Sequence, residues 1–107
     1  MTEITDPWSR WLLQDRYGGD ALALQRTMEF LEPIRDRVLS AAEARPGAVV
    51  LDVGCGDGLL GFGALPLVGD SGRIVFSDVS EELLERCRQI AGELGVLERC
   101  RFVPTAA

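Results

Sequence analysis

Apolar runs alternate with short glycine- and proline-containing turns over the second half of the chain, which is typical of strands alternating with helices. Three of these runs are rich in β-branched residues and predict strands at 48–53, 73–77 and 100–103. Residues 48–53 are almost continuously apolar, which indicates a strand buried on both faces. Helices are expected between the strands, over 59–68 and 80–94.

The helix over 80–94 has the clearest signals. Ser80 is a suitable N-cap, and the acids Glu81 and Glu82 lie favourably at the positive end of the helix dipole. Gly95 is expected to end the helix. One stripe of residues is predicted to face the core: Leu83, Leu84, Cys87, Ile90, Ala91 and Leu94.

The first part of the chain has helical spacing. Asp6 and the proline after it mark the start of a short helix, and Asp20 caps a longer one from Ala21 to about Ala44. Pro33 is expected to split or kink this longer helix, because proline lacks the N–H that a helix interior needs. Its predicted inward positions are Leu24, Met28, Leu31, Val38 and Leu39.

The order strand–helix–strand–helix–strand predicts an α/β fold, with a parallel sheet and right-handed crossovers that form half of a doubly wound domain. We therefore divide the chain into an N-terminal helical extension, residues 1–44, and an α/β domain, residues 45–107. In the usual strand order 3-2-1, the strand over 48–53 has a neighbour on one side only. Because helices cannot satisfy an open sheet edge, self-association through this edge is one expected outcome.

The composition removes several chemistries from consideration. The 107 residues include no histidine, lysine or asparagine. Serine–histidine and cysteine–histidine catalysis, histidine-ligated zinc, Schiff-base lysines and the Walker lysine are therefore excluded. The three cysteines, Cys55, Cys87 and Cys100, form no C-x-x-C pair, so no metal site is predicted and a reducing compartment fits best.

The charge distribution bears on partners. The net charge is −6, and all eleven basic residues are arginines without a continuous basic run. Binding of nucleic acid along a phosphate-tracking surface is therefore disfavoured. No apolar run is long enough for a membrane span, and the N-terminus lacks the pattern of a signal peptide. We expect a cytoplasmic protein with neither a nucleic-acid nor a membrane partner.

The candidate chemistry lies in the turn after the first strand. Residues 54–58 carry glycine at every second position, which lets the backbone turn sharply and approach a ligand closely. The helix that follows points free N–H groups at the same place. Asp78, at the tip of the second strand, can accept hydrogen bonds from ribose hydroxyls. Together these features predict a nucleoside-containing ligand.

Two kinds of nucleoside ligand fit the glycine spacing. Residues 56–61 match the G-x-G-x-x-G of dinucleotide-binding proteins, which alone is a weak signal. Asp52 and Asp57 place carboxylates where a pyrophosphate would lie, and like charges about 4 Å apart repel by roughly 1 kcal/mol in water and more near a protein surface. A positively charged ligand reverses this sign. Asp52 could instead be a strand-end carboxylate held by backbone N–H groups, and Asp57 a solvated loop acid.

Residues 50–58, Val-Leu-Asp-Val-Gly-Cys-Gly-Asp-Gly, resemble the first motif of class I S-adenosyl-L-methionine-dependent methyltransferases. The resemblance continues through 73–78, where Asp78 resembles the ribose-binding acid, and covers roughly residues 45–104. It implies a Rossmann-like fold and S-adenosyl-L-methionine, a cationic cofactor without phosphate. It also implies cofactor contacts from a set of eight residues: Asp52, Gly54, Cys55, Gly56, Asp57, Gly58, Asp78 and Val79.

The resemblance further implies direct methyl transfer to a small-molecule acceptor. A complete class I domain has seven strands, whereas three are predicted here, so we expect a truncated enzyme that lacks the acceptor-binding half. No catalytic residue is assigned, and Cys55 is more consistent with a small residue in a crowded turn than with a nucleophile. Two alternatives stay open: half of an NAD(P)-binding oxidoreductase, and a non-catalytic fragment that depends on a partner.

Overall fold

The computed structural model describes residues 19–106. The chain divides into two compact units, residues 1–34 and 35–107. The short helix predicted after Asp6 lies outside the described residues. The sheet and the glycine-rich turn both belong to the second unit.

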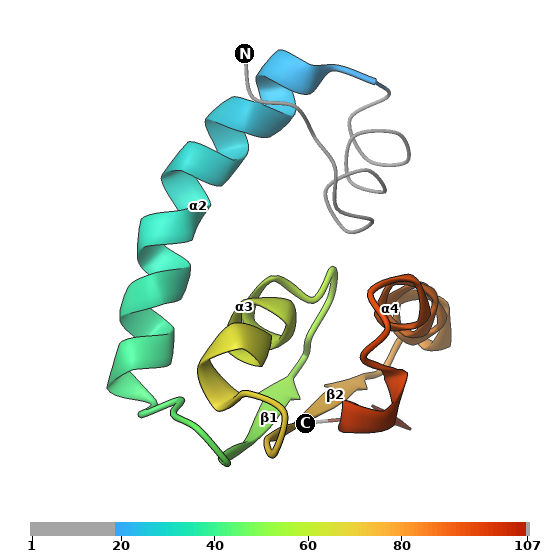
Figure 1. The fold of residues 1–107 in the computed structure, drawn as a ribbon. Coiled ribbons are helices and arrows are strands. Elements are labelled where there is room, and N and C mark those ends of the chain that lie inside the picture. The colour runs from blue at the N-terminus through green and yellow to red at the C-terminus, as the bar shows by residue number, and fades with distance from the viewer. Residues whose placement is uncertain (1–18, 107) are drawn as a thin grey trace. The chain divides into compact units, whose positions relative to one another are not determined.

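Helix α2 (Ala21–Ala41) begins where the sequence predicts it. Asp20 Oδ1 accepts a hydrogen bond from a backbone N–H of the first turn at 2.9 Å, as an N-cap does. Pro33 lies inside α2 and does not split it (Figure 1). Leu39 is 3% exposed, but Val38, also predicted to face inward, is 44% exposed. Neighbouring helix residues point about 100° apart, so only one of this pair faces the core.

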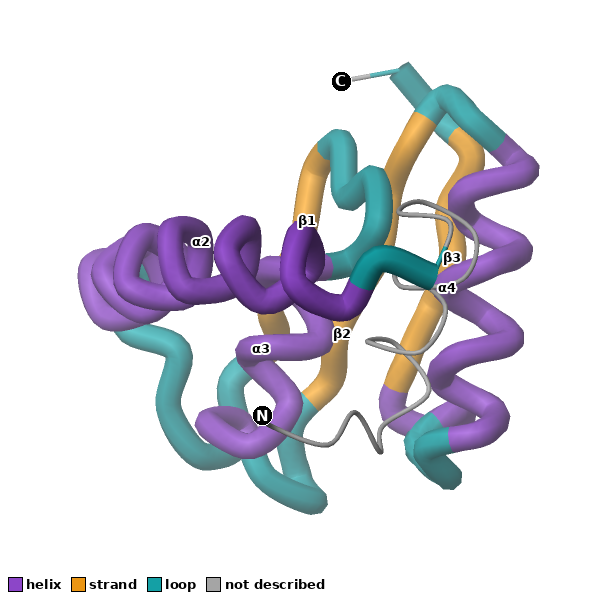
Figure 2. The backbone as a smooth tube through the Cα atoms, turned by 90° about the horizontal axis from the view of Figure 1, so that it is seen from above, coloured by secondary structure: helices purple, strands orange, loops and turns teal. Residues whose placement is uncertain are grey.

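Three parallel strands form one sheet in the order β1 (Val49–Val53), β2 (Arg73–Asp78), β3 (Cys100–Pro104). Figure 2 shows the strands side by side. Residue 52 pairs with Phe76 in the register, and Phe76 pairs with Phe102. The predicted parallel α/β arrangement is confirmed. Within the described residues, β1 has a neighbour on one side only.

Helices α3 (Leu59–Val68) and α4 (Glu81–Glu93) connect the strands and lie on the same side of the sheet (Figure 1). The predicted cap of α4 is confirmed, because Ser80 Oγ accepts a hydrogen bond from the Leu83 N–H at 3.2 Å. A short 3₁₀ helix, η2 (Leu97–Arg99), precedes β3 and was not predicted. The core between helices and sheet consists of Leu39, Cys55, Ala64, Leu65, Val68, Ile74, Phe76, Leu84 and Cys87.

The opposite face of the sheet is uncovered within the described part of the chain. Val49, Leu51 and Val53 of β1 are 69%, 59% and 51% exposed. The prediction that this strand is buried on both faces is therefore wrong, because α3 and α4 cover one face and successive side chains point to opposite faces. Leu94, predicted to face inward, is 37% exposed because it follows the last turn of α4.

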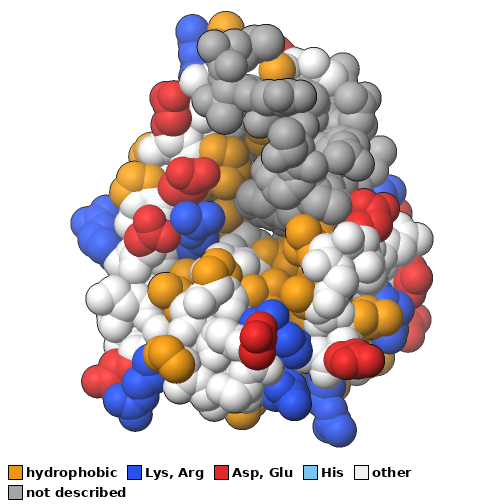
Figure 3. Space-filling view, viewed as in Figure 1, with side chains coloured by type: hydrophobic (Ala, Val, Ile, Leu, Met, Phe, Trp, Pro, Cys, Tyr) orange, Lys and Arg blue, Asp and Glu red, His pale blue; other side chains and the backbone are white. Residues whose placement is uncertain are grey.

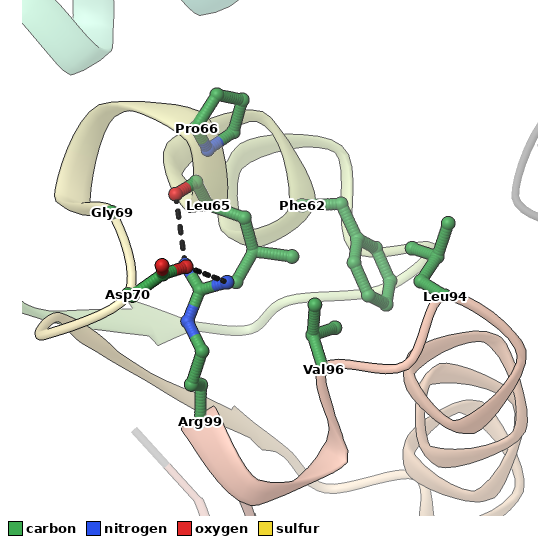
Figure 4. Close-up of a pocket in the computed structure, with 8 residues that line it drawn as sticks. All are labelled: Phe62, Leu65, Pro66, Gly69, Asp70, Leu94, Val96 and Arg99. Carbon is green, nitrogen blue, oxygen red and sulfur yellow. Dashed lines mark hydrogen bonds and ion pairs between the residues drawn. The ribbon is translucent and has the colours of Figure 1, made fainter.

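Charged side chains of both signs are interspersed on the face drawn in Figure 3. Arg99 lies in a hollow between the C-terminal ends of α3 and α4 (Figure 4). Its Nη2 donates to the Leu65 carbonyl at 3.0 Å, and its Nη1 lies 3.9 Å from an Asp70 carboxylate oxygen. Arg99 therefore places positive charge at the negative end of α3.

No described helix has an apolar stretch long enough to cross a membrane.

Gly61→Ala is expected to destabilise the fold. A Cβ at this α3 position would lie 2.2 Å from the Phe76 ring, which is completely buried and has little room to move aside. Overpacking of this kind should lower the free energy of unfolding by about 1–3 kcal/mol, measured by urea denaturation. Gly92→Ala on α4 is the matched control, because a Cβ there would meet nothing within 4 Å, and it should be neutral or stabilising. Equal losses in the two variants would contradict close packing at Gly61.

Candidate functional site

The loop between β1 and α3 has a backbone conformation that favours glycine. Gly54, Gly56 and Gly58 have φ values of 66°, 53° and 86°, all in the left-handed region. Two backbone hydrogen bonds hold the loop. The Cys55 N–H donates to the Ser77 carbonyl at 2.9 Å, and the Gly58 N–H donates to the Cys55 carbonyl at 2.8 Å. The alternating glycines therefore form a sharp turn at the carboxyl end of the sheet.

The two sides of this loop differ in how crowded they are. A Cβ at Gly58 would lie 2.5 Å from the Phe62 ring, so this side of the loop is packed against α3. A Cβ at Gly54 or Gly56 would meet no atom of the described residues within 4 Å. Among these residues, the backbone at Gly54 and Gly56 is therefore open to close approach by a ligand.

Asp78 ties the tip of β2 to this loop. Its Oδ2 accepts a hydrogen bond from the Gly56 N–H at 3.0 Å, and its Oδ1 accepts one from the Ser80 N–H at 2.8 Å. These backbone hydrogen bonds, led by the one from Ser80, lower the pKa of the Asp78 carboxyl group. Asp78 is therefore ionised at neutral pH and lies beside the glycine turn.

Asp52 is buried, with 7% of the residue exposed. Its Oδ2 accepts a hydrogen bond from the Gly61 N–H at 3.0 Å, in the first turn of α3. Burial raises the pKa of Asp52, the Gly61 hydrogen bond offsets part of this rise, and the charge of Asp78 adds to it. This contact fits the alternative interpretation of Asp52 from the sequence, a strand-end carboxylate held by backbone N–H groups. The carboxylate also places negative charge at the positive end of α3.

The predicted cofactor residues come together at one end of the sheet. Asp52 and Asp78 lie on the same face, because residue 52 pairs with 76 in the register and side chains two residues apart share a face. Neither acid forms an ion pair within the described residues. Asp57 lies half-buried in the loop, and Val79 follows Asp78 with 73% of its surface exposed. The structure therefore gathers acids and one exposed apolar side chain around an open backbone turn.

The thiols at this site are poor nucleophiles. Burial, followed by the charges of Asp52 and Asp78, raises the pKa of Cys55 to about 11. Cys55 is 8% exposed and therefore remains protonated at neutral pH. This agrees with its interpretation as a small residue in a crowded turn.

Two residues near the loop have roles that the sequence did not reveal. Cys87 was predicted as a core residue and is completely buried, but its Sγ also lies 3.5 Å from the Gly56 carbonyl oxygen. Gly61, which binds Asp52 through its N–H, also allows α3 to approach the Phe76 ring. Gly61 occupies the third glycine position of G-x-G-x-x-G, which favours close helix packing, so its role could have been recognised from the sequence. Nothing local marked Cys87 as a neighbour of the loop.

The two acids should titrate on opposite sides of their common reference pKa of 3.8, with Asp52 above it and Asp78 below it. Because folding raises the pKa of Asp52, this group's contribution to the free energy of unfolding falls as the pH rises from 3.8 through the raised value. The contribution of Asp78 has the opposite sign, and is lost as the pH falls below 3.8 through the lowered value. Carboxyl-carbon NMR titration of the folded protein measures the pKa of each acid.

The Asp78→Asn variant provides the control for this titration. It removes a charge that raises the Asp52 pKa, so the Asp52 midpoint should move down. An unchanged Asp52 midpoint would contradict the electrostatic coupling of the two acids.

Comparisons with known proteins agree with this geometry. A family model described as a methyltransferase domain matches residues 44–104. The chain is 38% identical over 69 residues to nocamycin O-methyltransferase of Saccharothrix syringae, a match that covers 64% of this chain and 25% of that protein. It is 41% identical over 66 residues to a probable cobalt-precorrin-6B C(15)-methyltransferase (decarboxylating) of Saccharolobus solfataricus, which covers 62% of this chain and 33% of that protein. The matched segment thus spans a quarter to a third of these relatives.

A solved structure shows the same arrangement of elements. The SAM-dependent methyltransferase from Aquifex aeolicus matches with a TM-score of 0.55 and 30% identity, over 63% of this chain and 35% of that chain. The family match favours a methyltransferase over a dinucleotide-binding oxidoreductase as the explanation of the glycine spacing. With its parallel sheet, its glycine turn and the acids around it, this chain belongs to the class I S-adenosylmethionine-dependent methyltransferases.

Proposed function

We propose that this chain binds S-adenosylmethionine at the loop between β1 and α3, and that it is the cofactor-binding part of a unit that methylates a small-molecule acceptor. The observation that carries the proposal is the Asp52 carboxylate at the start of α3. In dinucleotide-binding proteins this helix end receives a phosphate. Here an acid already accepts the Gly61 N–H, so the site favours a cationic ligand over a phosphate.

Asp78 and Val79 are the proposed contacts for the nucleoside. Each Asp78 carboxylate oxygen accepts one backbone N–H, and a carboxylate oxygen has a second lone pair with which to accept a ribose hydroxyl. The exposed Val79 side chain offers apolar surface beside it, against which a nucleobase can pack. The open backbone at Gly54 and Gly56 accommodates the rest of the cofactor at short range. Cys55, Asp57 and Gly58 complete the proposed binding set.

The proposed role of these residues is binding and orientation. S-adenosylmethionine, when bound, supplies a methyl group on a positively charged sulfur that an acceptor can attack directly. The Cys55 thiol stays protonated at neutral pH, so this residue does not serve as a covalent carrier of the methyl group. Holding donor and acceptor in line supplies much of the rate acceleration in such a reaction.

Two observations support a small-molecule acceptor. The names of both curated relatives refer to small molecules, nocamycin and cobalt-precorrin-6B. The net charge of −6 and the absence of a continuous basic run in the sequence disfavour a nucleic-acid acceptor. Because the chain spans 25% and 33% of these relatives, we propose that the acceptor is held by polypeptide other than the described strands.

The uncovered side of β1 supports a second part of the proposal. The strand leaves one row of backbone groups unpaired within the described residues, and three of its apolar side chains are exposed. Open edges of this kind pair readily with another strand. We propose that isolated chains associate with one another through this edge and the adjoining apolar face.

Calorimetry with S-adenosylmethionine and the Asp78→Ala variant tests the proposed cofactor site. The variant loses a carboxylate that fixes the loop and accepts hydroxyl groups, so its affinity should fall roughly tenfold or more. Asp70→Ala is the matched control, because Asp70 is fully exposed in the turn after α3, and its affinity should not change. Binding of NADH without binding of S-adenosylmethionine would overturn the proposal.

Sedimentation velocity over a range of protein concentrations tests the proposed association. Wild-type chains should sediment as larger species when concentrated, and Leu51→Lys should sediment as a monomer because it places a charge on the uncovered face. Leu67→Lys is the matched control, since Leu67 is 42% exposed on α3, away from that face. A monomeric wild-type chain with a cooperative thermal transition would contradict this part of the proposal.

A further inference from the structure

Cys87 contacts the loop between β1 and α3, residues 54–58, which we call the cofactor loop. It lies in α4 and is completely buried. Its Sγ donates to the Gly56 carbonyl oxygen at 3.5 Å, across 31 positions of sequence. A Cβ added at Gly58 would lie 3.3 Å from the same sulfur. The thiol therefore touches the peptide segment that carries two of the three loop glycines.

The thiol can donate this hydrogen bond throughout the neutral pH range. Burial raises the pKa of Cys87, and the charge of Cys55 and a hydrogen bond to the Cys55 side chain add to the rise, so the sulfur keeps its proton. Cys55 Sγ lies 4.0 Å from the same Gly56 carbonyl oxygen. A longer contact of this kind is weaker, so the Cys87 thiol is the principal side-chain donor to the carbonyl.

Gly56 is consequently held at both of its backbone polar groups. Its N–H donates to Asp78 Oδ2 at 3.0 Å, and its carbonyl accepts from Cys87. Asp78 ends β2 and Cys87 belongs to α4, so the two restraints come from different elements. A loop that is already fixed loses less conformational freedom when a ligand binds to it.

We propose that Cys87 is a positioning residue for the cofactor loop: its S–H fixes the Gly56 carbonyl, and the fixed loop sets the affinity for the cofactor. The proposal rests on the proposed function of this loop. It differs from a simple packing role, because packing depends on side-chain volume whereas positioning depends on a hydrogen-bond donor.

Cys87→Ala and Cys87→Ser separate the two roles. Cys87→Ala should weaken S-adenosylmethionine binding about three- to tenfold, as expected for one neutral hydrogen bond, and should speed exchange of the Gly56 amide proton by a similar factor. Cys87→Ser keeps a donor and should recover part of both losses. Cys100→Ala is the matched control, since this half-buried thiol of β3 should affect stability without changing affinity or Gly56 exchange.

Three results would overturn the proposal: an affinity and Gly56 exchange rate of Cys87→Ala within twofold of wild type, equal losses in the Ala and Ser variants, or the same losses in Cys100→Ala. If Cys87→Ala does not fold, Cys87→Val takes its place, because valine fills a similar volume without a hydrogen-bond donor and should speed Gly56 exchange relative to Cys87→Ser. Failure of the wild-type chain to bind S-adenosylmethionine would reject the proposed function. The Gly56 exchange rates of the ligand-free variants would still decide whether Cys87 positions the loop.

Discussion

The packing of helices against Phe76 is the constraint on which the rest of this structure depends. The ring is completely buried at the centre of the sheet, with its centroid 4.9 Å from that of Phe62 on α3 and 5.5 Å from that of Phe102 on β3. Only glycine at position 61 lets α3 approach this ring, because a side chain there would overlap it. The start of α3, and with it the end of the glycine loop, is therefore placed by hydrophobic packing.

Charge then determines what the loop can bind. The packing that brings α3 onto β2 also buries Asp52 at the first turn of the helix, where it uses an N–H that a phosphate would need. Asp78 adds negative charge from the neighbouring strand and is itself bonded to the loop. Two acids without ion-pair partners among the described residues give the site a negative potential. A cationic nucleoside is the ligand class that such a potential favours.

The two faces of the sheet have different surroundings, and each supports a different part of the proposed function: cofactor binding or self-association. The face under α3 and α4 carries the buried core and supports the cofactor loop. The other face exposes apolar side chains of β1, and the chain spans only part of the length of its curated relatives. We propose that the cofactor is recognised at the loop supported by the first face, and that a second copy covers the second face when the chain is isolated.

Local signals in the sequence were sufficient to predict the order of the described strands and α-helices, the parallel sheet, the Ser80 cap and the glycine turn. Each depends on residues a few positions apart: β-branched runs, a capping hydroxyl, and glycine at alternate positions. The exposure of Leu51 and the contact of Cys87 with Gly56 could not be predicted in this way. Burial depends on which elements pack on each face, and partners 31 positions apart meet only when α4 packs against the sheet beside the loop.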